Sequence, residues 1–319
     1  MVGGNKNMSK ENTAVTKKKM KRDFITILAL MMALSSCNDD ALFEKEMYKN
    51  VVALISSDYY NTFEEVVTLS PTGEEATGYI AACTGGTHAP KQDMVIGLEE
   101  DLTSLEFYNR SLYDVDEACY AKFLSSDKYE IVDYKIQINA GERTGRTMIR
   151  IRPEGLSPDS TYFVGLKATD ISGVEINESK NTILYQILIK NDYATQGENV
   201  YYSMTGLADG MATAGNKKMF PLTHNSVRVI AGTESFESNV DHINKTAIIL
   251  QVEENNHVTI KPYKDIEVTQ IDGDSKYPNT FKVEESFGHT YNVFLLSYRY
   301  TKDGKSKVMQ EELRLEINN

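Results

Sequence analysis

The sequence contains no tryptophan, and its three cysteines, Cys37, Cys83 and Cys119, never form a CxxC pair. Structural zinc sites and thioredoxin-like redox motifs use cysteines at such close spacing, so neither is supported. Tryptophan offers the largest aromatic face on which a sugar ring can stack, and its absence weakens the expectation of glycan binding.

The signatures of several enzyme classes are also absent. The five histidines include no HExxH pair, and no serine lies in a GxSxG elbow. Residues 84–87 (TGGT) are neither a P-loop nor a dinucleotide fingerprint. Residues 272–275 begin like a calcium loop, but Tyr277 stands where an EF-hand needs glycine. We therefore expect no catalytic residue, no metal ligand and no cofactor.

Carboxylates cluster at residues 99–101 and 114–117. A glycosidase needs two carboxylic groups held about 5 to 9.5 Å apart. The sequence does not show which of these carboxylates would converge in a cleft, so a solvated acidic surface is the prediction. The net charge of −12 is spread along the chain without a basic patch, which argues against a nucleic-acid partner.

The longest apolar run is short and lies near the start of the chain. It extends from Phe24 to Leu34, about half of the roughly 20 residues that a membrane-spanning helix needs. Basic residues precede it from Lys17 to Arg22, and Leu34-Ser35-Ser36-Cys37 closes it. This is the pattern of a secretion signal. We predict a signal peptide over residues 1–36, for which Met20 is a second plausible start.

The end of this segment resembles the lipobox of bacterial lipoproteins, in which the cysteine becomes the lipidated first residue. The resemblance implies that Cys37 carries a lipid anchor and that residues 37–47 form a tether. Asn38, Asp39 and Asp40 resemble the export signal that sends Bacteroidota lipoproteins to the outer face of the outer membrane. An exported setting permits a disulfide between Cys83 and Cys119, with two buried thiols as the alternative.

Residues 48–190 are predicted to form an antiparallel, Ig-like β-sandwich with small helices. Apolar and polar residues alternate over 132–139 and again over 162–168, as in half-buried strands. Residues 147–152 predict another strand, and residues 102–108 and 115–124 predict short helices. No helical period lasts long enough for a βαβ crossover, so the fold is predicted to be all-β with two domains.

Residues 191–199 are polar and aperiodic and are predicted to be a linker to a second β domain over 200–319. Short strands are predicted at 247–252, 258–261, 266–271, 280–283 and 291–300, in an antiparallel sandwich or barrel. Asp303-Gly304 fits a type I′ hairpin turn, which sets Tyr298 opposite Met309 and Phe294 opposite Leu313.

Tyrosine is abundant, with 19 residues that combine an apolar ring with a hydrogen-bonding tip. Adjacent pairs occur at Tyr59-Tyr60 and Tyr201-Tyr202, and neighbours on a strand point to opposite faces. Exposed tyrosines can stack on pyranose rings, whereas alternating core and rim positions are the structural alternative. Tyr201 and Tyr202, which begin the second domain, are our candidate ligand-binding residues.

The segments "LEFYNRSLYDVD" and "LSPDSTYFVGLKATDISG" resemble an N-terminal domain of unknown function in Bacteroidota surface lipoproteins, and "YNVFLLSYRYTKDGK" is similar to its C-terminal partner. The resemblance implies a non-enzymatic accessory lipoprotein of a starch-utilisation-like glycan-uptake system, binding a polysaccharide or oligosaccharide beside an outer-membrane transporter. The alternatives are an adhesin or assembly lipoprotein that contacts proteins, and a glycoside hydrolase.

Overall fold

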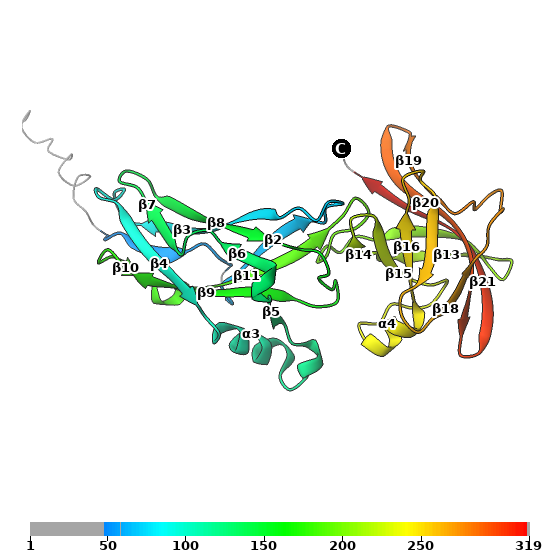
Figure 1. The fold of residues 1–319 in the computed structure, drawn as a ribbon, viewed down its shortest axis with the longest axis horizontal. Coiled ribbons are helices and arrows are strands. Elements are labelled where there is room, and N and C mark those ends of the chain that lie inside the picture. Colours follow the sequence, from blue (N-terminus) through cyan, green and yellow to red (C-terminus); the bar gives the residue numbers. More distant parts are fainter. Residues whose placement is uncertain (1–47, 58, 318–319) are drawn as a thin grey trace, which may run out of the picture. The chain divides into compact units, whose positions relative to one another are not determined.

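The computed structural model describes residues 48–57 and 59–317. The predicted signal peptide, the tether, Cys37 and the Asn38-Asp39-Asp40 export signal all lie outside these residues. Strands dominate the described chain and form four sheets, two in each of two β domains, which confirms the all-β, two-domain prediction (Figure 1). Among the described residues, no helix is long and apolar enough to cross a membrane.

The first domain contains two sheets. The first has the strand order β10-β1-β3-β8-β6, with β1 (Val51–Leu54), β3 (Ala76–Gly85), β6 (Tyr129–Ile131), β8 (Thr144–Ile151) and β10 (Glu175–Ile176). The second has the order β2-β11-β9-β4-β7, with β2 (Thr62–Thr68), β4 (Met94–Glu100), β7 (Lys135–Ile138), β9 (Tyr162–Asp170) and β11 (Thr182–Lys190), and β5 (Lys122–Phe123) pairs with β9.

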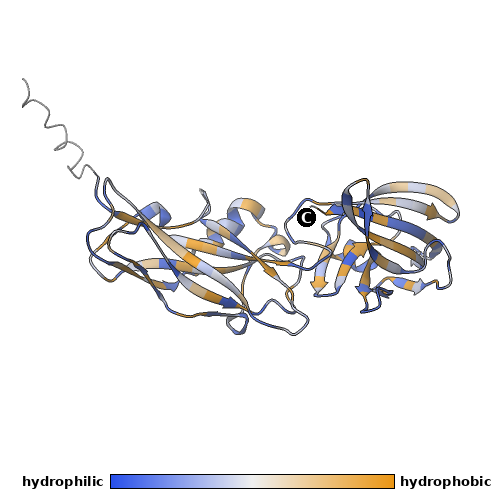
Figure 2. Cartoon of the chain, turned by 90° about the horizontal axis from the view of Figure 1, so that it is seen from above, coloured by the Kyte–Doolittle hydropathy of each residue, from blue (hydrophilic) through white to orange (hydrophobic). Residues whose placement is uncertain are grey.

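A single apolar core joins these two sheets into a sandwich. Ile80 and Ile149 of the first sheet and Leu166 and Ile187 of the second are fully buried in it. Inward side chains recur every second residue along β3 and β8, as the pleat of a strand requires. Hydrophobic and hydrophilic residues accordingly alternate along the strands in Figure 2.

Three strand pairs of this sandwich are parallel, so the antiparallel prediction holds only in part. The pair β2 and β11 runs parallel over seven residues, and β1 with β10 and β5 with β9 are the other two. Parallel partners are joined by long stretches of chain. The 113 residues between Thr68 and Thr182 form such a long connection, which alternation within one strand does not reveal.

The predicted strand over residues 132–139 is wrong in its first half. Strand β6 belongs to one sheet and β7 to the other, and the chain crosses between them at residues 132–134. Val132 and Tyr134 are therefore exposed, whereas Ile136 and Ile138 are buried. The apolar alternation continues through a bend that only the packing of the two sheets defines.

The second domain also contains two sheets. The larger has the order β13-β12-β21-β20-β18, with β12 (Tyr202–Ala208), β13 (Met211–Lys217), β18 (Glu267–Gln270), β20 (His289–Lys302) and β21 (Lys305–Ile317), and β19 (Thr280–Ser286) pairs with β20. The smaller has the order β14-β15-β16-β17, with β14 (Phe220–Thr223), β15 (Ser226–Ile230), β16 (Ala247–Val252) and β17 (Val258–Pro262).

One core packs between these sheets, which makes the second domain a sandwich. Val227 and Leu250 of the smaller sheet meet Phe294 and Leu296 of the larger one, and all four are fully buried. Every strand pair in both sheets is antiparallel. The sequence predicted either a sandwich or a barrel for this domain, and the presence of two separate sheets shows that it is a sandwich.

The predicted hairpin at the end of the chain is confirmed. Phe294 lies opposite Leu313 and Tyr298 opposite Met309 in the pairing of β20 with β21. Asp303 and Gly304 have φ angles of 50° and 70°, the positive values that a type I′ turn needs at both central positions.

The helices are few and short. Helix α3 (Ser104–Tyr113) lies against β9 and β11, where Leu105 contacts the buried Phe163 and Leu184 (Figure 1). Helix α4 (Val240–Thr246) of the second domain had no predicted counterpart. Within residues 48–57 and 59–317, single 3-10 turns make up the rest: η1 (Glu117–Cys119), η2 (Ser126–Lys128) and η3 (Glu178–Lys180).

Two further regions were predicted to be loosely held or covalently linked. Within residues 191–199, Asn191 and Gln196 are buried, and Asn191 donates to the carbonyl oxygens of Thr223 and Ser226 at 2.7 and 2.9 Å. Hydrogen bonds therefore hold the start of this segment in place. Cys83 and Cys119 are both free thiols, so the disulfide that export would permit is not formed.

Residues 48–50 and 85–88 form a small unit of their own. The backbone N–H of Tyr48 donates to Oγ1 of Thr87 at 2.9 Å, and the N–H of Thr87 donates to the carbonyl oxygen of Tyr48 at 3.2 Å. These reciprocal bonds hold the start of the described chain against the end of β3.

Candidate functional sites

A cavity of about 280 Å³ opens on the second domain beside the start of β12, and we call it the Tyr193 cavity. Its walls come from four parts of the chain: residues 191–202, Met219, β20 and the end of β21. The residues that line it are Asn191, Asp192, Tyr193, Ala194, Thr195, Glu198, Val200, Tyr202, Met219, Asn292, Leu315, Glu316 and Ile317.

Hydrogen bonds fix the wall that carries Tyr193. Oδ1 of Asn191 accepts from the N–H groups of Tyr193 and Ala194, both at 3.0 Å. The hydroxyl of Tyr202 donates to the carbonyl oxygen of Tyr193 at 2.8 Å, and Nδ2 of Asn292 donates to that of Asp192 at 3.1 Å. The wall is thus preorganised by side chains that themselves line the cavity.

Packed aromatic rings support the base of the cavity. The ring of Tyr193 meets Phe281 edge to face at 5.0 Å and Phe294 at 5.7 Å, and Tyr202 meets Phe294 at 5.9 Å. Burial and the nearby Asp192 raise the pKa of Tyr193, so its hydroxyl stays protonated and able to donate at neutral pH.

The lining charge is negative. Asp192, Glu198 and Glu316 contribute carboxylates, and no lysine or arginine is among the lining residues. His289 contacts Glu316 from outside at 2.7 Å. Aromatic rings, amides and carboxylate acceptors together suit a neutral ligand with many hydroxyl groups.

The two tyrosines predicted to bind ligand have different environments. Tyr202 is buried, lines the Tyr193 cavity and uses its hydroxyl internally. Tyr201 is 49% exposed just before β12 and is not among the lining residues. One of the pair does face away from the core. The sequence did not predict Tyr193, Asn292 and Glu316 as site residues, because they come from positions up to 123 residues apart and form no local motif.

A second, larger cavity of about 530 Å³ lies between α4 and the β20–β21 hairpin. Its lining residues include Asp241, Asp265 and Glu267 together with Lys245 and Lys302. No tyrosine or phenylalanine is among them, and Lys302 is already paired with Glu234. This cavity therefore lacks the tyrosine rings that line the Tyr193 cavity.

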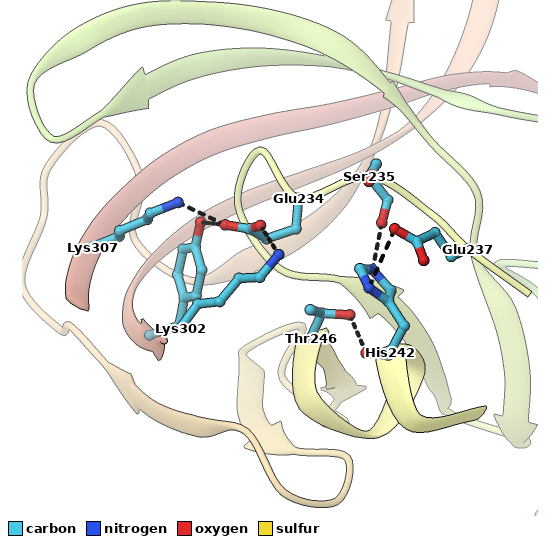
Figure 3. A network of polar contacts seen from close by, with 8 residues as sticks. Glu234, Ser235, Glu237, His242, Thr246, Lys302 and Lys307 are labelled. Carbon is cyan, nitrogen blue, oxygen red and sulfur yellow. Dashed lines mark hydrogen bonds and ion pairs between the residues drawn. The ribbon is translucent and has the colours of Figure 1, made fainter. Parts of the chain in front are cut away.

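A buried-carboxylate network lies next to this second cavity (Figure 3). Glu234 accepts hydrogen bonds from Lys302 at 2.5 Å, Lys307 at 2.8 Å and the hydroxyl of Tyr300 at 3.0 Å. Burial alone would raise its pKa, but the three donors outweigh burial and lower the pKa of Glu234 to about 2. With every donor engaged, this network is a structural clamp between the hairpin and the segment after β15.

Comparison with known proteins finds two family models that match parts of this chain. A family model for an N-terminal domain matches residues 43–175, and one for a C-terminal domain matches residues 181–314. The first matched region ends at residue 175 and the second begins at residue 181. The domain boundary predicted at residues 191–199 stays a prediction. No curated protein matches the chain.

Several solved structures share the fold. A protein of unknown function from Bacteroides ovatus has a TM-score of 0.60 at 16% identity, over 87% of this chain and 93% of its own. A second B. ovatus protein of unknown function has a TM-score of 0.60 at 15% identity, over 83% and 94%. An auxiliary nutrient binding protein from Bacteroides thetaiotaomicron has a TM-score of 0.53 at 12% identity, over 82% and 93%. At these identities the likeness concerns the fold.

Proposed function

We propose that this chain is a non-enzymatic, lipid-anchored surface protein of a glycan-uptake system and that it binds a neutral saccharide at the Tyr193 cavity. The composition of the cavity carries the proposal: two tyrosines, two asparagines and three carboxylates surround an apolar base. A pyranose ring has an apolar face and a rim of hydroxyls, and such a site offers a partner to each.

The charge of the cavity narrows the class of saccharide. Three lining carboxylates without a lining cation favour hydroxyl donors and repel uronate or sulfate groups. A neutral oligosaccharide or the end of a neutral polysaccharide is therefore the expected ligand.

The size of the cavity sets the expected affinity. About 280 Å³ lies at the lower end of the range for small-molecule sites. Little surface is buried there and much polar surface must be desolvated, so dissociation constants from about micromolar to millimolar are expected.

The cellular setting rests on the sequence. The lipobox at Cys37 and the acidic residues that follow it support anchoring at the outer face of the outer membrane. The lack of a catalytic signature supports a binding role. An auxiliary nutrient binding protein shares this fold, which also supports a binding role. We further propose that the chain acts beside an outer-membrane transporter.

The test is calorimetry with the full chain in a mild detergent against neutral polysaccharides of plant, host and microbial origin. A Tyr193→Ala variant removes the ring at the centre of the cavity and should weaken binding at least tenfold. Phe287→Ala is the matched control, because Phe287 is a fully exposed aromatic residue at the β19–β20 turn and is not among the lining residues.

Two results would contradict the proposal. One is the absence of binding to any saccharide together with tight association with a protein, which would favour the adhesin or assembly alternative. The other is release of reducing ends from a bound glycan, which would make the chain a glycosidase.

A further inference from the structure

The first domain carries a cluster of aromatic rings that the cavity does not explain. The turn before β2 provides Tyr59 and Tyr60, and α3 provides Phe107 and Tyr108. We call these four residues the Tyr59 surface. Tyr59 meets Tyr60 edge to face at 4.6 Å, and Phe107 lies 6.2 Å from Tyr59 and 6.1 Å from Tyr60.

Packing holds these rings in place from below. Tyr60 meets Tyr108 at 5.3 Å, and Tyr108 meets the fully buried Phe163 at 5.0 Å, both edge to face. The contacts lead from the buried cluster beneath α3 outward to Tyr59. The two outermost rings are nevertheless open to solvent, with Tyr59 74% and Phe107 54% exposed.

Helix α3 is itself fixed rigidly, which fixes Phe107. The carboxylate of Asp101 accepts from the N–H groups of Thr103 and Ser104 at 3.0 and 3.2 Å and so holds the chain at the start of the helix. Asn109 exchanges two hydrogen bonds with the backbone of Ala121, at 2.8 and 2.9 Å. Such preorganisation lowers the entropy lost when a ligand binds.

Polar groups lie at the edge of the rings. The pKa of Tyr108 is raised to about 12 by burial first, then by Tyr113, with which it shares a hydrogen bond, and by the nearby Glu64 and Tyr60. The Tyr113 hydroxyl and the Glu64 carboxylate therefore lie near the hydroxyl of Tyr108.

The exposed apolar area is small for a protein partner. An aromatic side chain offers about 150–250 Å², so Tyr59 and Phe107 together expose at most about 300 Å². A stable protein interface uses about 800 Å² on each side. The exposed Leu112 does not extend the area, because at roughly 100° per residue it points about 140° around α3 from Phe107.

We propose that the Tyr59 surface is a second saccharide-binding site, on which the exposed rings of Tyr59 and Phe107 stack against pyranose faces of a neutral glycan. This inference rests on the proposed function and extends it from one site to two. The open surface suits internal residues of a long chain, since no wall limits the ligand at either end.

The absence of tryptophan allows a clean optical test. Tyr59→Trp enlarges the stacking face and introduces a single indole reporter into the full chain. The probes are cellohexaose, mannohexaose, xylohexaose and maltohexaose, with the protein in a mild detergent. At least one hexasaccharide should change the indole emission saturably. In the matched control, Phe287→Trp, the emission should stay unchanged.

Loss-of-function variants separate this site from the Tyr193 cavity. Calorimetry of the wild type with the active hexasaccharide should show two binding sites. The double variant Tyr59→Ala/Phe107→Ala should keep only the Tyr193 cavity, with its far-ultraviolet circular dichroism unchanged. Tyr193→Ala should keep only the Tyr59 surface.

The outcomes are distinguishable. If the double variant binds like the wild type while Tyr193→Ala loses binding, the second site is refuted and the proposed function stands. If only Tyr193→Ala is without effect, the cavity assignment fails and the Tyr59 surface stands. Loss of a protein partner in the double variant, with saccharide binding intact, or a wild type that binds no hexasaccharide, overturns the inference.

Discussion

Nζ of Lys217 lies 2.6 Å from Oε2 of Glu311, and the two side chains are only 5% and 0% exposed. The hydroxyl of Tyr298 donates to Oε1 of the same carboxylate at 2.7 Å and accepts from the N–H of Gly232 at 2.7 Å. Strands β13, β20 and β21 and the segment after β15 thus meet at one buried carboxylate in the second domain.

Glu311→Gln should destabilise the protein strongly. A buried charge is costly unless it is paired, and the variant leaves the ammonium of Lys217 buried without a counter-charge, at a cost of about 3–5 kcal/mol. Urea denaturation followed by circular dichroism measures the free energy of unfolding. The control is Glu106→Gln, which removes the exposed Glu106–Arg110 pair of α3 and should cost under about 0.5 kcal/mol. Equal effects of the two variants would contradict the argument.

The Glu234 network should make stability depend on pH. Its folded pKa of about 2 lies below the ordinary value of 4.5, so this carboxylate stabilises the fold fully above pH 4.5, and the contribution is lost as pH falls toward 2. After allowance for solvent screening, about 1–2 kcal/mol is expected. Urea midpoints of wild type and Glu234→Gln should differ at pH 6 and converge near pH 2. A constant difference between them would refute this.

Gly304→Ala should weaken the terminal hairpin. Gly304 has a φ of 70°, where a Cβ is disfavoured, so a loss of about 1 kcal/mol in the free energy of unfolding is expected. Gly85→Ala is the control, because that glycine is not in the left-handed region and an added Cβ would meet no atom within 4 Å. Thermal unfolding of both variants checks the prediction, and similar losses would argue against a strained turn.

Local signals account for the parts of the fold that the sequence predicts well. The Asp303-Gly304 turn fixes the register of β20 and β21 within a few residues, and β16 begins and ends at the predicted positions, 247 and 252. The prediction that Val132 and Tyr134 belong to the same strand as Ile136 was wrong, because the chain changes sheets at residues 132–134. Packing between the two sheets determines this crossing, and alternation along one strand does not reveal it.

The candidate sites were less predictable for the same physical reason. Alternation predicts that Tyr201 and Tyr202 face opposite ways, but not that Tyr202 is the buried one or that its hydroxyl holds Tyr193. The Tyr59-Tyr60 pair is visible in the sequence, whereas its partner Phe107 comes from a helix 47 residues away. Glu234 has no sequence signal, because its donors come from a hairpin about 70 residues later.

Cys37→Ala should release the protein from the membrane. A lipid anchor contributes about 0.8 kcal/mol for each buried methylene, and this variant removes the acylation site. The wild type should fractionate with the outer membrane and incorporate labelled palmitate, and the variant should do neither. Cys119→Ala is the control, since it removes an exposed thiol outside the lipobox. A membrane-bound, palmitate-labelled Cys37→Ala protein would refute the lipoprotein assignment.

Tyr202→Phe and Tyr201→Ala should separate the roles of the two adjacent tyrosines. Tyr202→Phe keeps the buried ring but removes the hydroxyl that holds the carbonyl of Tyr193, at a cost of about 1 kcal/mol in stability. Because the wall of the Tyr193 cavity is then less fixed, saccharide binding should weaken several-fold. Tyr201→Ala removes a half-exposed ring outside the lining and should change affinity less than Tyr193→Ala does. Calorimetry with the active hexasaccharide ranks the three variants. If Tyr201→Ala proves the most damaging, the ligand binds at the exposed start of β12 instead of in the cavity.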